Sequence, residues 1–269
     1  AVGTSAATTR ADQIMLGRGT TTTTVANLAG SGTGLVVTNA DGTLSRSAIS
    51  ATALTSLNCT ATGDNATCYG PNASATGRNA SAFGNSATAS NTGAIALGDR
   101  ANASGSAATA LGAIAIASGR KATALGKEAT ASGYYSTALG DQANASGNSS
   151  TALGRKANAA GEAATALGVD STASGKFSTA LGVANASGDS ATAMGTFATA
   201  SGYEATALGS KANAAYANST AVGTSAATTR ADQIVLGTGT TTTTVANLAG
   251  SGTGLVVTNA DGTLSRSAI

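Results

Sequence analysis

Short β-prone stretches alternate with glycine-centred breaks through the middle of the chain. From Gly63 to Gly223, glycine returns at almost every seventh position, and about four residues of alternating character precede each glycine. Two variable positions follow it. Such a pattern predicts a short strand and then a tight turn, in which glycine supplies the positive φ that a side chain disfavours.

The full repeat is twice this interval, because the residue before glycine alternates between leucine and serine. One unit runs from Ser136 to Gly147, with Leu139 before the first glycine and Ser146 before the second. A self-similar period of this kind is typical of a solenoid whose coils stack on their neighbours. Two strands and two turns per unit predict an all-β parallel solenoid in which each 14-residue unit is one flattened coil. We expect Leu139 to be buried together with Thr137, since residues two apart share a strand face.

One interval is a residue short, between Gly182 and Gly188. The alternation of leucine-type and serine-type positions continues across it, with Ser187 and then Met194. The strand register is therefore predicted to survive the missing residue. Only the turn should be shorter, and Met194 should keep the leucine position.

The charged residues follow the same period. Between Gly63 and Gly223 there are 17 of them, 9 basic and 8 acidic, and all lie one or two positions after a glycine slot. This distribution indicates that only the turns face water, while strand side chains are packed. Five aromatic residues share these turn positions and, with four cations, are the candidate surface contacts: Tyr134, Tyr135, Phe177, Phe197, Tyr203, Arg120, Lys121, Arg155 and Lys156.

Composition limits the chemistry that this chain can support. A net charge of +2 over 269 residues favours neither nucleic acid nor an anionic membrane as partner, and no apolar run reaches transmembrane length. The absence of histidine rules out a Ser-His-Asp or Cys-His arrangement, and the carboxylates are isolated on turns. We therefore expect no enzyme activity, no catalytic or cofactor-binding residues, and neither a cofactor nor a metal.

The two cysteines, Cys59 and Cys68, lie where the repeats begin. Because the predicted turn after Gly63 folds the chain back, an intrachain disulfide is favoured over free thiols in a secreted protein. Such a bridge would pin the first coil, which has no stacked neighbour on one side. The alternative, metal binding, lacks the further cysteine or histidine that a site requires.

A long internal duplication points to a tandem array. Residues 1–49 recur as 221–269 with two differences, Met15 against Val235 and Arg18 against Thr238. The predicted organisation has five parts: the end of a preceding solenoid (1–9), a β-rich connector (10–49), a segment leading into the repeats (50–62), the solenoid (63–223) and a second copy of the connector (224–269).

Each connector copy is predicted to hold a β-hairpin. In the first, Leu35–Thr38 and Thr43–Ser45 flank the turn-like stretch Asn39–Gly42. The run of five threonines from Thr20 would also suit a flexible, glycosylated linker. Its mixture with Val25 and Leu28 favours ordered β structure instead.

Alternating Ala-Leu-Gly and Ala-Ser-Gly turns at 14-residue spacing resemble the head of YadA-type trimeric autotransporter adhesins. The resemblance covers residues 63–223, and the connectors resemble the family's necks more weakly. It implies a left-handed parallel β-roll with three chains side by side around one axis. Each coil carries only one large apolar side chain, which by itself also favours self-association. No heptad stalk follows the connector, which departs from the family pattern.

The resemblance also implies a function and a place. We expect an extracellular fibre segment on the bacterial surface, anchored to the outer membrane through a region outside this stretch. It would attach the cell to a host or abiotic surface or to other cells. Its partners would be further copies of itself and an extracellular matrix protein or another surface ligand. A purely structural surface filament or a phage-type tail fibre is the alternative.

An unbroken column of threonines suggests another alternative function. It lies three residues before the glycine slot on the leucine-type strands and comprises Thr109, Thr123, Thr137, Thr151, Thr165, Thr179, Thr192, Thr206 and Thr220. A flat, outward threonine array on a β-solenoid would be typical of an ice-binding surface. The expected burial of Leu139 on the same strand face argues against it.

Overall fold

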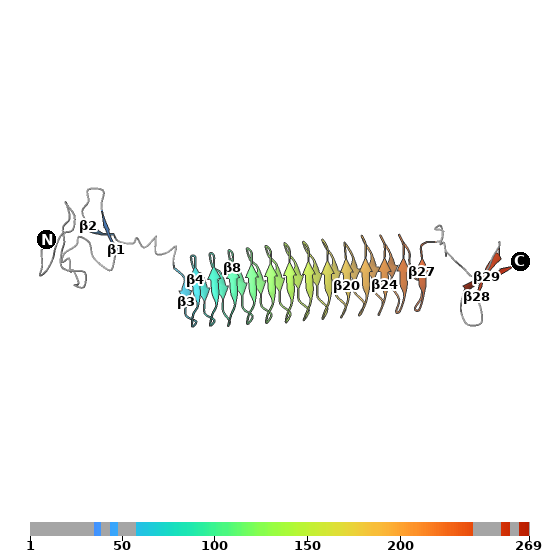
Figure 1. The fold of residues 1–269 in the computed structure, drawn as a ribbon, viewed down its shortest axis with the longest axis horizontal. Coiled ribbons are helices and arrows are strands. Elements are labelled where there is room, and N and C mark those ends of the chain that lie inside the picture. The colour runs from blue at the N-terminus through green and yellow to red at the C-terminus, as the bar shows by residue number, and fades with distance from the viewer. Residues whose placement is uncertain (1–34, 39–43, 48–57, 239–253, 259–263, 269) are drawn as a thin grey trace, which may run out of the picture. The chain divides into compact units, whose positions relative to one another are not determined.

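The computed structural model describes residues 35–38, 44–47, 58–238, 254–258 and 264–268 (Figure 1). The chain divides into two compact units, Ala1–Leu57 and Asn58–Ile269. Every element in the described ranges is a strand, and they contain no helix that could span a membrane. The central and largest part is a parallel β-roll, which confirms the predicted fold class.

The roll consists of two parallel sheets. The first has 13 strands, most of which end in leucine, and we call it the leucine sheet. Its strands are β4 (Thr67–Tyr69), β6 (Ser81–Phe83), β8 (Ile95–Leu97), β10 (Thr109–Leu111), β12 (Thr123–Leu125), β14 (Thr137–Leu139), β16 (Thr151–Leu153), β18 (Thr165–Leu167), β20 (Thr179–Leu181), β22 (Thr192–Met194), β24 (Thr206–Leu208), β26 (Thr220–Val222) and β27 (Ile234–Leu236).

The second sheet has 12 strands, most of them followed by serine, and we call it the serine sheet. Its strands are β3 (Thr60–Ala61), β5 (Ser74–Ala75), β7 (Thr88–Ala89), β9 (Asn102–Ala103), β11 (Ile116–Ala117), β13 (Thr130–Ala131), β15 (Asn144–Ala145), β17 (Asn158–Ala159), β19 (Thr172–Ala173), β21 (Asn185–Ala186), β23 (Thr199–Ala200) and β25 (Asn213–Ala214). The chain alternates between the two sheets, so each pair of strands forms one coil.

Neighbouring coils stack in register, so that like residues form columns. In the leucine sheet Thr137 pairs with Thr151 and Leu139 with Leu153. In the serine sheet Asn144 pairs with Asn158, and their side-chain amides are joined by a hydrogen bond of 3.0 Å. The predicted 14-residue coil is therefore confirmed. Because every strand repeats the one below it, any surface feature of a coil is multiplied along the roll.

Alanine, not leucine, fills the interior of the roll. Ala138 is fully buried, whereas Leu139 is 37% exposed and Thr137 is half-buried. The expectation that Leu139 and Thr137 are buried is therefore wrong, although the two do share a face. The physical reason is the narrow space between the sheets, which side chains of alanine and serine size fill completely. The larger leucine and threonine must point outward.

The turns are built differently from the expected glycine turn. The positive φ falls on the second residue after the glycine slot, as at Lys121 and Tyr135, both with φ of 57°. Glycines that follow the leucine strands also have positive φ, as at Gly140. Gly133, which follows a serine strand, is required for another reason: a Cβ there would lie 1.9 Å from the carbonyl oxygen of Gly147 in the next coil. Close stacking of the turns excludes a side chain.

The short interval behaves as predicted. Across it Thr172 pairs with Asn185 and Leu181 pairs with Met194, so the register of both sheets is preserved. Met194 is 43% exposed, like the leucines of its column. The missing residue is absorbed in the turn after Gly182, which confirms that only the turn is shortened.

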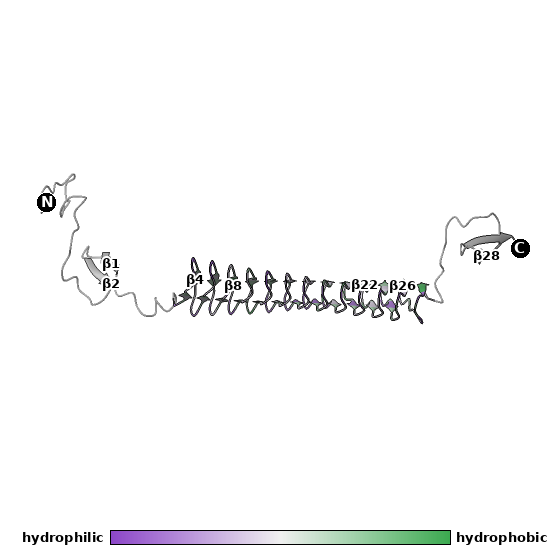
Figure 2. Ribbon diagram, turned by 90° about the horizontal axis from the view of Figure 1, so that it is seen from below, coloured by the Kyte–Doolittle hydropathy of each residue, from purple (hydrophilic) through white to green (hydrophobic). Residues whose placement is uncertain are grey.

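The roll extends beyond both predicted boundaries. At its beginning, β3 already pairs with β5 before Gly63. At its end, β27 pairs with β26, and it stands out in Figure 2 as the hydrophobic strand that completes the stack. The predicted end of the solenoid at Gly223 is therefore too early. Arg230 occupies the next glycine slot, so the glycine repeat in the sequence breaks off before the last coil.

Two hairpins lie in the connectors. Strand β1 (Leu35–Thr38) pairs with β2 (Leu44–Ser47), and β28 (Gly254–Thr258) pairs with β29 (Leu264–Ala268), both antiparallel. This confirms the predicted hairpin in each copy. The other predicted connector segments, residues 10–34 and 239–253, lie outside the described residues.

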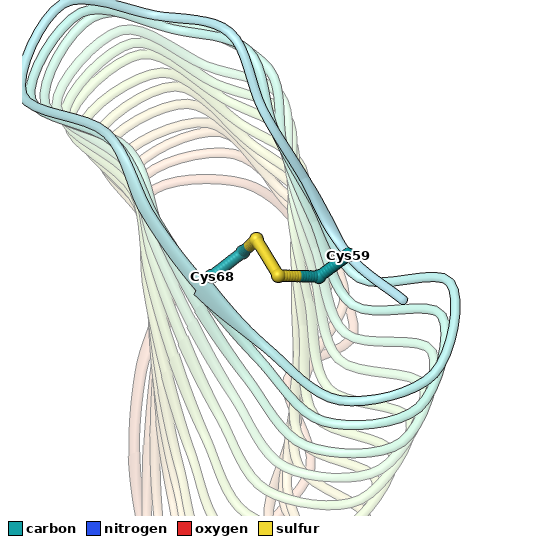
Figure 3. Close-up of a disulfide and its surroundings, with 2 residues drawn as sticks. All are labelled: Cys59 and Cys68. Carbon is teal, nitrogen blue, oxygen red and sulfur yellow. A yellow bond between two sulfur atoms is a disulfide. The ribbon is translucent and has the colours of Figure 1, made fainter. Parts of the chain in front are cut away.

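A disulfide joins the two sheets at the first coil. Cys59 and Cys68 are bonded, with their Cα atoms 5.9 Å apart, and the bridge crosses the interior of the roll (Figure 3). Cys68 pairs in register with Ala82, so it occupies an inward alanine position. The bridge therefore replaces the packing that a preceding coil supplies elsewhere, as the sequence predicted.

Candidate functional site

Two surfaces of the roll stand out, and they lie at opposite corners of each coil. The turns that follow leucine-sheet strands form one long border of the roll, which we call the leucine edge. The turns that follow serine-sheet strands form the other, the serine edge. Each candidate residue can be assigned to one of these edges from the strand that precedes it.

A continuous apolar ridge runs beside the leucine edge. It is formed by the outward residues that end the leucine-sheet strands. From Leu97 to Met194, each of these residues is either half-buried or between 36% and 45% exposed. Near the N-terminal end of the roll these residues line an open groove of about 890 Å³ together with Tyr69 and Phe83. Repeated apolar exposure on this scale indicates a surface made for contact. The sequence does not reveal the ridge, because hydrophobicity alone predicts that its leucines are buried.

The structure divides the predicted contact residues between the two edges. Tyr134, Tyr135, Phe177, Tyr203, Arg120 and Lys121 lie on the serine edge, whereas Phe197, Arg155 and Lys156 lie on the leucine edge. All five aromatic side chains are at least 50% exposed. Their turn positions are those that the sequence assigned to them. Tyr216, 45% exposed and in a glycine slot of the serine edge, was not among the predicted residues.

Four of the predicted residues come together in one cluster. Arg120 and Lys121 occupy the two turn positions of one coil, and Tyr134 and Tyr135 occupy the same positions of the next. The Arg120 Nη1 donates a hydrogen bond of 3.4 Å to the Tyr135 hydroxyl, and the Lys121 Nζ lies 5.2 Å from the centre of its ring. Such contacts hold both cations against the aromatic face. The other predicted residues are not part of this cluster.

A shallow polar groove continues from the cluster onto the serine sheet. We call it the serine groove. It has a volume of about 360 Å³ and is lined by Ser104, Ser118 and Ser132, with Arg120 and Tyr134 on one side. The serines stand at the ends of three successive serine-sheet strands. Hydroxyls, a guanidinium and an aromatic ring therefore face one open channel.

Ion pairs neutralise several of the other charged turns. Arg155 forms an ion pair of 3.5 Å with Asp170 of the next coil, and Lys176 forms one of 2.8 Å with Glu162. The hydrogen bond that Glu162 accepts raises the pKa of Lys176. These pairs are exposed and therefore contribute little to stability.

Hydrogen bonds between successive turns perturb two carboxylates. Asn85 donates to Asp99 at 2.8 Å, which with the neighbouring Arg100 lowers the pKa of that carboxyl group. Gln142 donates to Glu128 at 2.8 Å and, with Lys127, lowers the pKa of Glu128. Both bonds join residues 14 apart, so they link one coil to the next. Their role is to align turns.

The described residues offer no evident place for a metal. Within them, no three histidine, cysteine, aspartate or glutamate side chains gather closely enough to coordinate an ion. The exposed columns and the two grooves are instead suited to contact with a large partner.

Comparison with known proteins identifies the repeat. The family model described as the YadA head domain repeat matches eight segments, residues 75–101, 89–115, 103–129, 117–143, 131–157, 159–183, 186–212 and 200–226, which together cover more than half of the chain. The crystal structure of the collagen-binding domain of the Yersinia adhesin YadA is similar at 22% identity, covering 71% of this chain and 84% of that one, with a TM-score of 0.30. A comparison with curated proteins gave no significant match.

The family model follows the roll coil by coil. Its matched segments begin 14 residues apart through most of the series, which is the spacing at which the strands pair. The repeat unit of the family and the coil of the structure are therefore the same unit. This chain belongs to the YadA head domain family.

Proposed function

We propose that this chain is a non-enzymatic adhesin segment that acts outside the cell, on a bacterial surface, and attaches it to a host or abiotic surface or to other cells. The observation that carries this proposal is the run of YadA head repeats over residues 75–226. The exposed aromatic and charged turns support it, because they offer many equivalent contacts along one roll. An extracellular matrix protein or another surface ligand is the partner we propose.

The apolar ridge supports a homotrimer as the working form. A row of leucines such as Leu125 and Leu139, each 37% exposed, would be covered if chains packed side by side with their ridges inward. Covering such surface is the main favourable contribution to association. Three chains around one axis is the arrangement that the family resemblance implies. The serine edge and serine sheet then face outward.

Sedimentation measures this directly. The fragment should sediment at about three times its chain mass of 25.2 kDa. Replacing Leu139 and Leu153 by lysine places charges on the ridge and should yield monomers. The matched control replaces Ser146 and Ser174, exposed on the serine sheet, by lysine and should remain trimeric. A stable wild-type monomer at micromolar concentration would refute the trimer.

Adhesion itself is tested on the turns. Replacing Tyr134, Tyr135, Phe177, Phe197 and Tyr203 by serine should reduce attachment of coated beads to a target surface, because these side chains are exposed. The circular dichroism spectrum and melting temperature should change little. Attachment that fails only when the fold is lost would favour the purely structural filament, including a phage-type fibre, as the function.

The threonine column supports a second candidate, ice binding. Thr109 to Thr220 do stack in register and point outward. They share their sheet face with the apolar ridge, however, so a trimer that covers the ridge would cover the threonines too. We therefore expect no thermal hysteresis from the wild-type fragment. Hysteresis that is lost on replacing Thr137 and Thr151 by leucine would establish the ice-binding function instead.

A further inference from the structure

Among the described residues, Arg120 of the serine groove and its neighbour Lys121 form no ion pair, whereas four other turn cations do. Along the described serine edge, the acids nearest to Arg120 are Glu162 and Asp64, three and four coils away. At a rise of about 4.8 Å per coil these separations are about 14 and 19 Å. Both exceed the Debye length of about 8 Å at physiological salt. Arg120 and Lys121 therefore present an unneutralised positive charge to an approaching ligand.

Tyr135 holds these cations in place without neutralising them. Its hydroxyl accepts one hydrogen bond from Arg120 Nη1, which leaves the Nε and Nη2 side of the guanidinium without a hydrogen bond to any residue that the structure describes. That side can donate two parallel hydrogen bonds to a carboxylate. The cluster is thus already arranged for a planar anionic group.

Tyr134 and the serines supply contacts of a different kind. Tyr134 is 56% exposed, and its backbone N–H donates a 3.0 Å hydrogen bond to Asn148, which fixes the turn that carries the ring. An exposed aromatic face can stack on the C–H face of a sugar ring. The hydroxyls of Ser104, Ser118 and Ser132 line the same channel and can donate to or accept from sugar hydroxyls.

We propose that the serine groove binds a linear polysaccharide whose sugars carry carboxylates, such as uronic acids. A neutral glycan would leave Arg120 and Lys121 unused, and a small anion would leave the serines and Tyr134 unused. The groove runs along the stack, and two coils rise about 9.6 Å, close to the length of one disaccharide in a β-linked polymer. The proposal rests on the proposed adhesive function and specifies one class of ligand for it.

The position of the groove makes it compatible with the proposed trimer. It lies on the serine sheet at the serine edge, whereas the apolar ridge lies on the leucine sheet at the leucine edge. Packing of the ridges would therefore leave the groove exposed on each of three chains. One polymer that reached several grooves would bind tightly although each contact is weak.

The test measures binding of the whole fragment to immobilised polysaccharides by surface plasmon resonance. The probes are hyaluronan, a uronate polymer of animal matrix, alginate, a uronate polymer of microbial and algal origin, and neutral dextran. We expect binding to at least one uronate polymer, weakened by added salt, and none to dextran. Which uronate polymer binds more tightly distinguishes an animal from a microbial source.

The chain provides a matched control for the charges. Arg155 and Lys156 form the same dipeptide in the same turn positions on the leucine edge, and Lys156 has the same φ of 57° as Lys121. Replacing Arg120 and Lys121 by glutamine should weaken uronate binding by about tenfold or more, since charge-assisted hydrogen bonds are lost. Replacing Arg155 and Lys156 by glutamine should leave it unchanged.

A second pair of variants tests the aromatic contact. Tyr134→Phe keeps the ring and should retain binding, while Tyr134→Ser should weaken it, with unchanged circular dichroism in both cases. Equal losses in both charge variants, or equal binding of dextran, would overturn the proposal. So would equally tight binding of poly-glutamate, which would indicate an acidic protein as the ligand. Failure of these tests with intact bead attachment would refute the polysaccharide site alone and leave the adhesive function standing.

Discussion

Each inward alanine of the roll contributes a single methyl group to the space between the two sheets. Ala124, Ala138 and Ala152 are fully buried and stack in one column. Where serine takes an inward position, as at Ser136, its hydroxyl donates to the carbonyl of Gly133 at 2.7 Å, so this buried hydroxyl is not left unpaired. Side-chain volume therefore decides which residues fit inside.

Enlarging an inward alanine should destabilise the roll. Ala138→Leu adds a branched side chain where the packing has no free space, and overpacking of this kind typically costs about 1–3 kcal/mol, occasionally more. We expect a lower denaturation midpoint in urea.

The neighbouring residue provides the contrast. Leu139→Ala removes a side chain that is 37% exposed in one chain. At a concentration where chains are separate, it should cost less than the roughly 2–5 kcal/mol that is typical of a buried leucine. In an assembled trimer the cost per chain should approach that range.

An Ala138→Leu variant that is as stable as the wild type would contradict the conclusion that the interior of the roll is too narrow for leucine.

At the scale of the element, the period of the sequence determines where strands and turns fall, and these could be predicted. The orientation of the strands could not. The triplet Thr137-Ala138-Leu139 establishes that threonine and leucine share a face, but not which face is inside. Hydrophobicity alone favours leucine as the buried residue. The short distance between the two sheets, which the sequence does not reveal, places alanine inside and leucine outside.

The candidate site was predictable in its residue types more than in its grouping. Turn positions identified Arg120 and Tyr134 as exposed. Their proximity follows from two facts together: both turns come after serine-type strands, and they are 14 residues apart. The last coil was missed because Arg230 replaces glycine, although the Ile234–Leu236 strand keeps the pattern of an apolar residue before glycine.

The disulfide at the first coil should stabilise the N-terminal end of the roll. In the chain-entropy model a loop this short contributes about 2–3 kcal/mol. Replacing Cys59 and Cys68 by alanine keeps side chains that fit the inward positions. We expect faster amide hydrogen exchange at Thr60 and Thr67, with little change at Thr137 in the middle of the roll. Uniform acceleration along the whole roll would show that the coils unfold as one unit.

At the scale of the whole molecule, the stability of the roll should depend little on pH near neutrality. There is no histidine, and the shifted groups are all on exposed turns. Asp99 and Glu128 have lowered pKa values, so their contributions are present above the ordinary carboxyl range and are lost as the pH falls. Lys176 has a raised pKa, so its contribution is present at lower pH and is lost as the pH rises.

The melting temperature should therefore be flat from about pH 5 to about pH 10 and should decline outside that window. Melting curves recorded at one-unit intervals test this. A sharp change between pH 6 and 7 would mean that a group outside the turns controls stability.

In-register stacking also means that the roll can be shortened without disruption only by deleting whole coils. Removing residues 137–150 would join Ser136 to Thr151, where the same strand begins again, and should shorten the head by one coil, about 4.8 Å. Removing only 137–143 would join Ser136 to Asn144 and place every later leucine strand on the opposite sheet. The apolar ridge would then change sides at the junction, and three chains could no longer align along their full length. Changes in head length are therefore expected to come in whole coils.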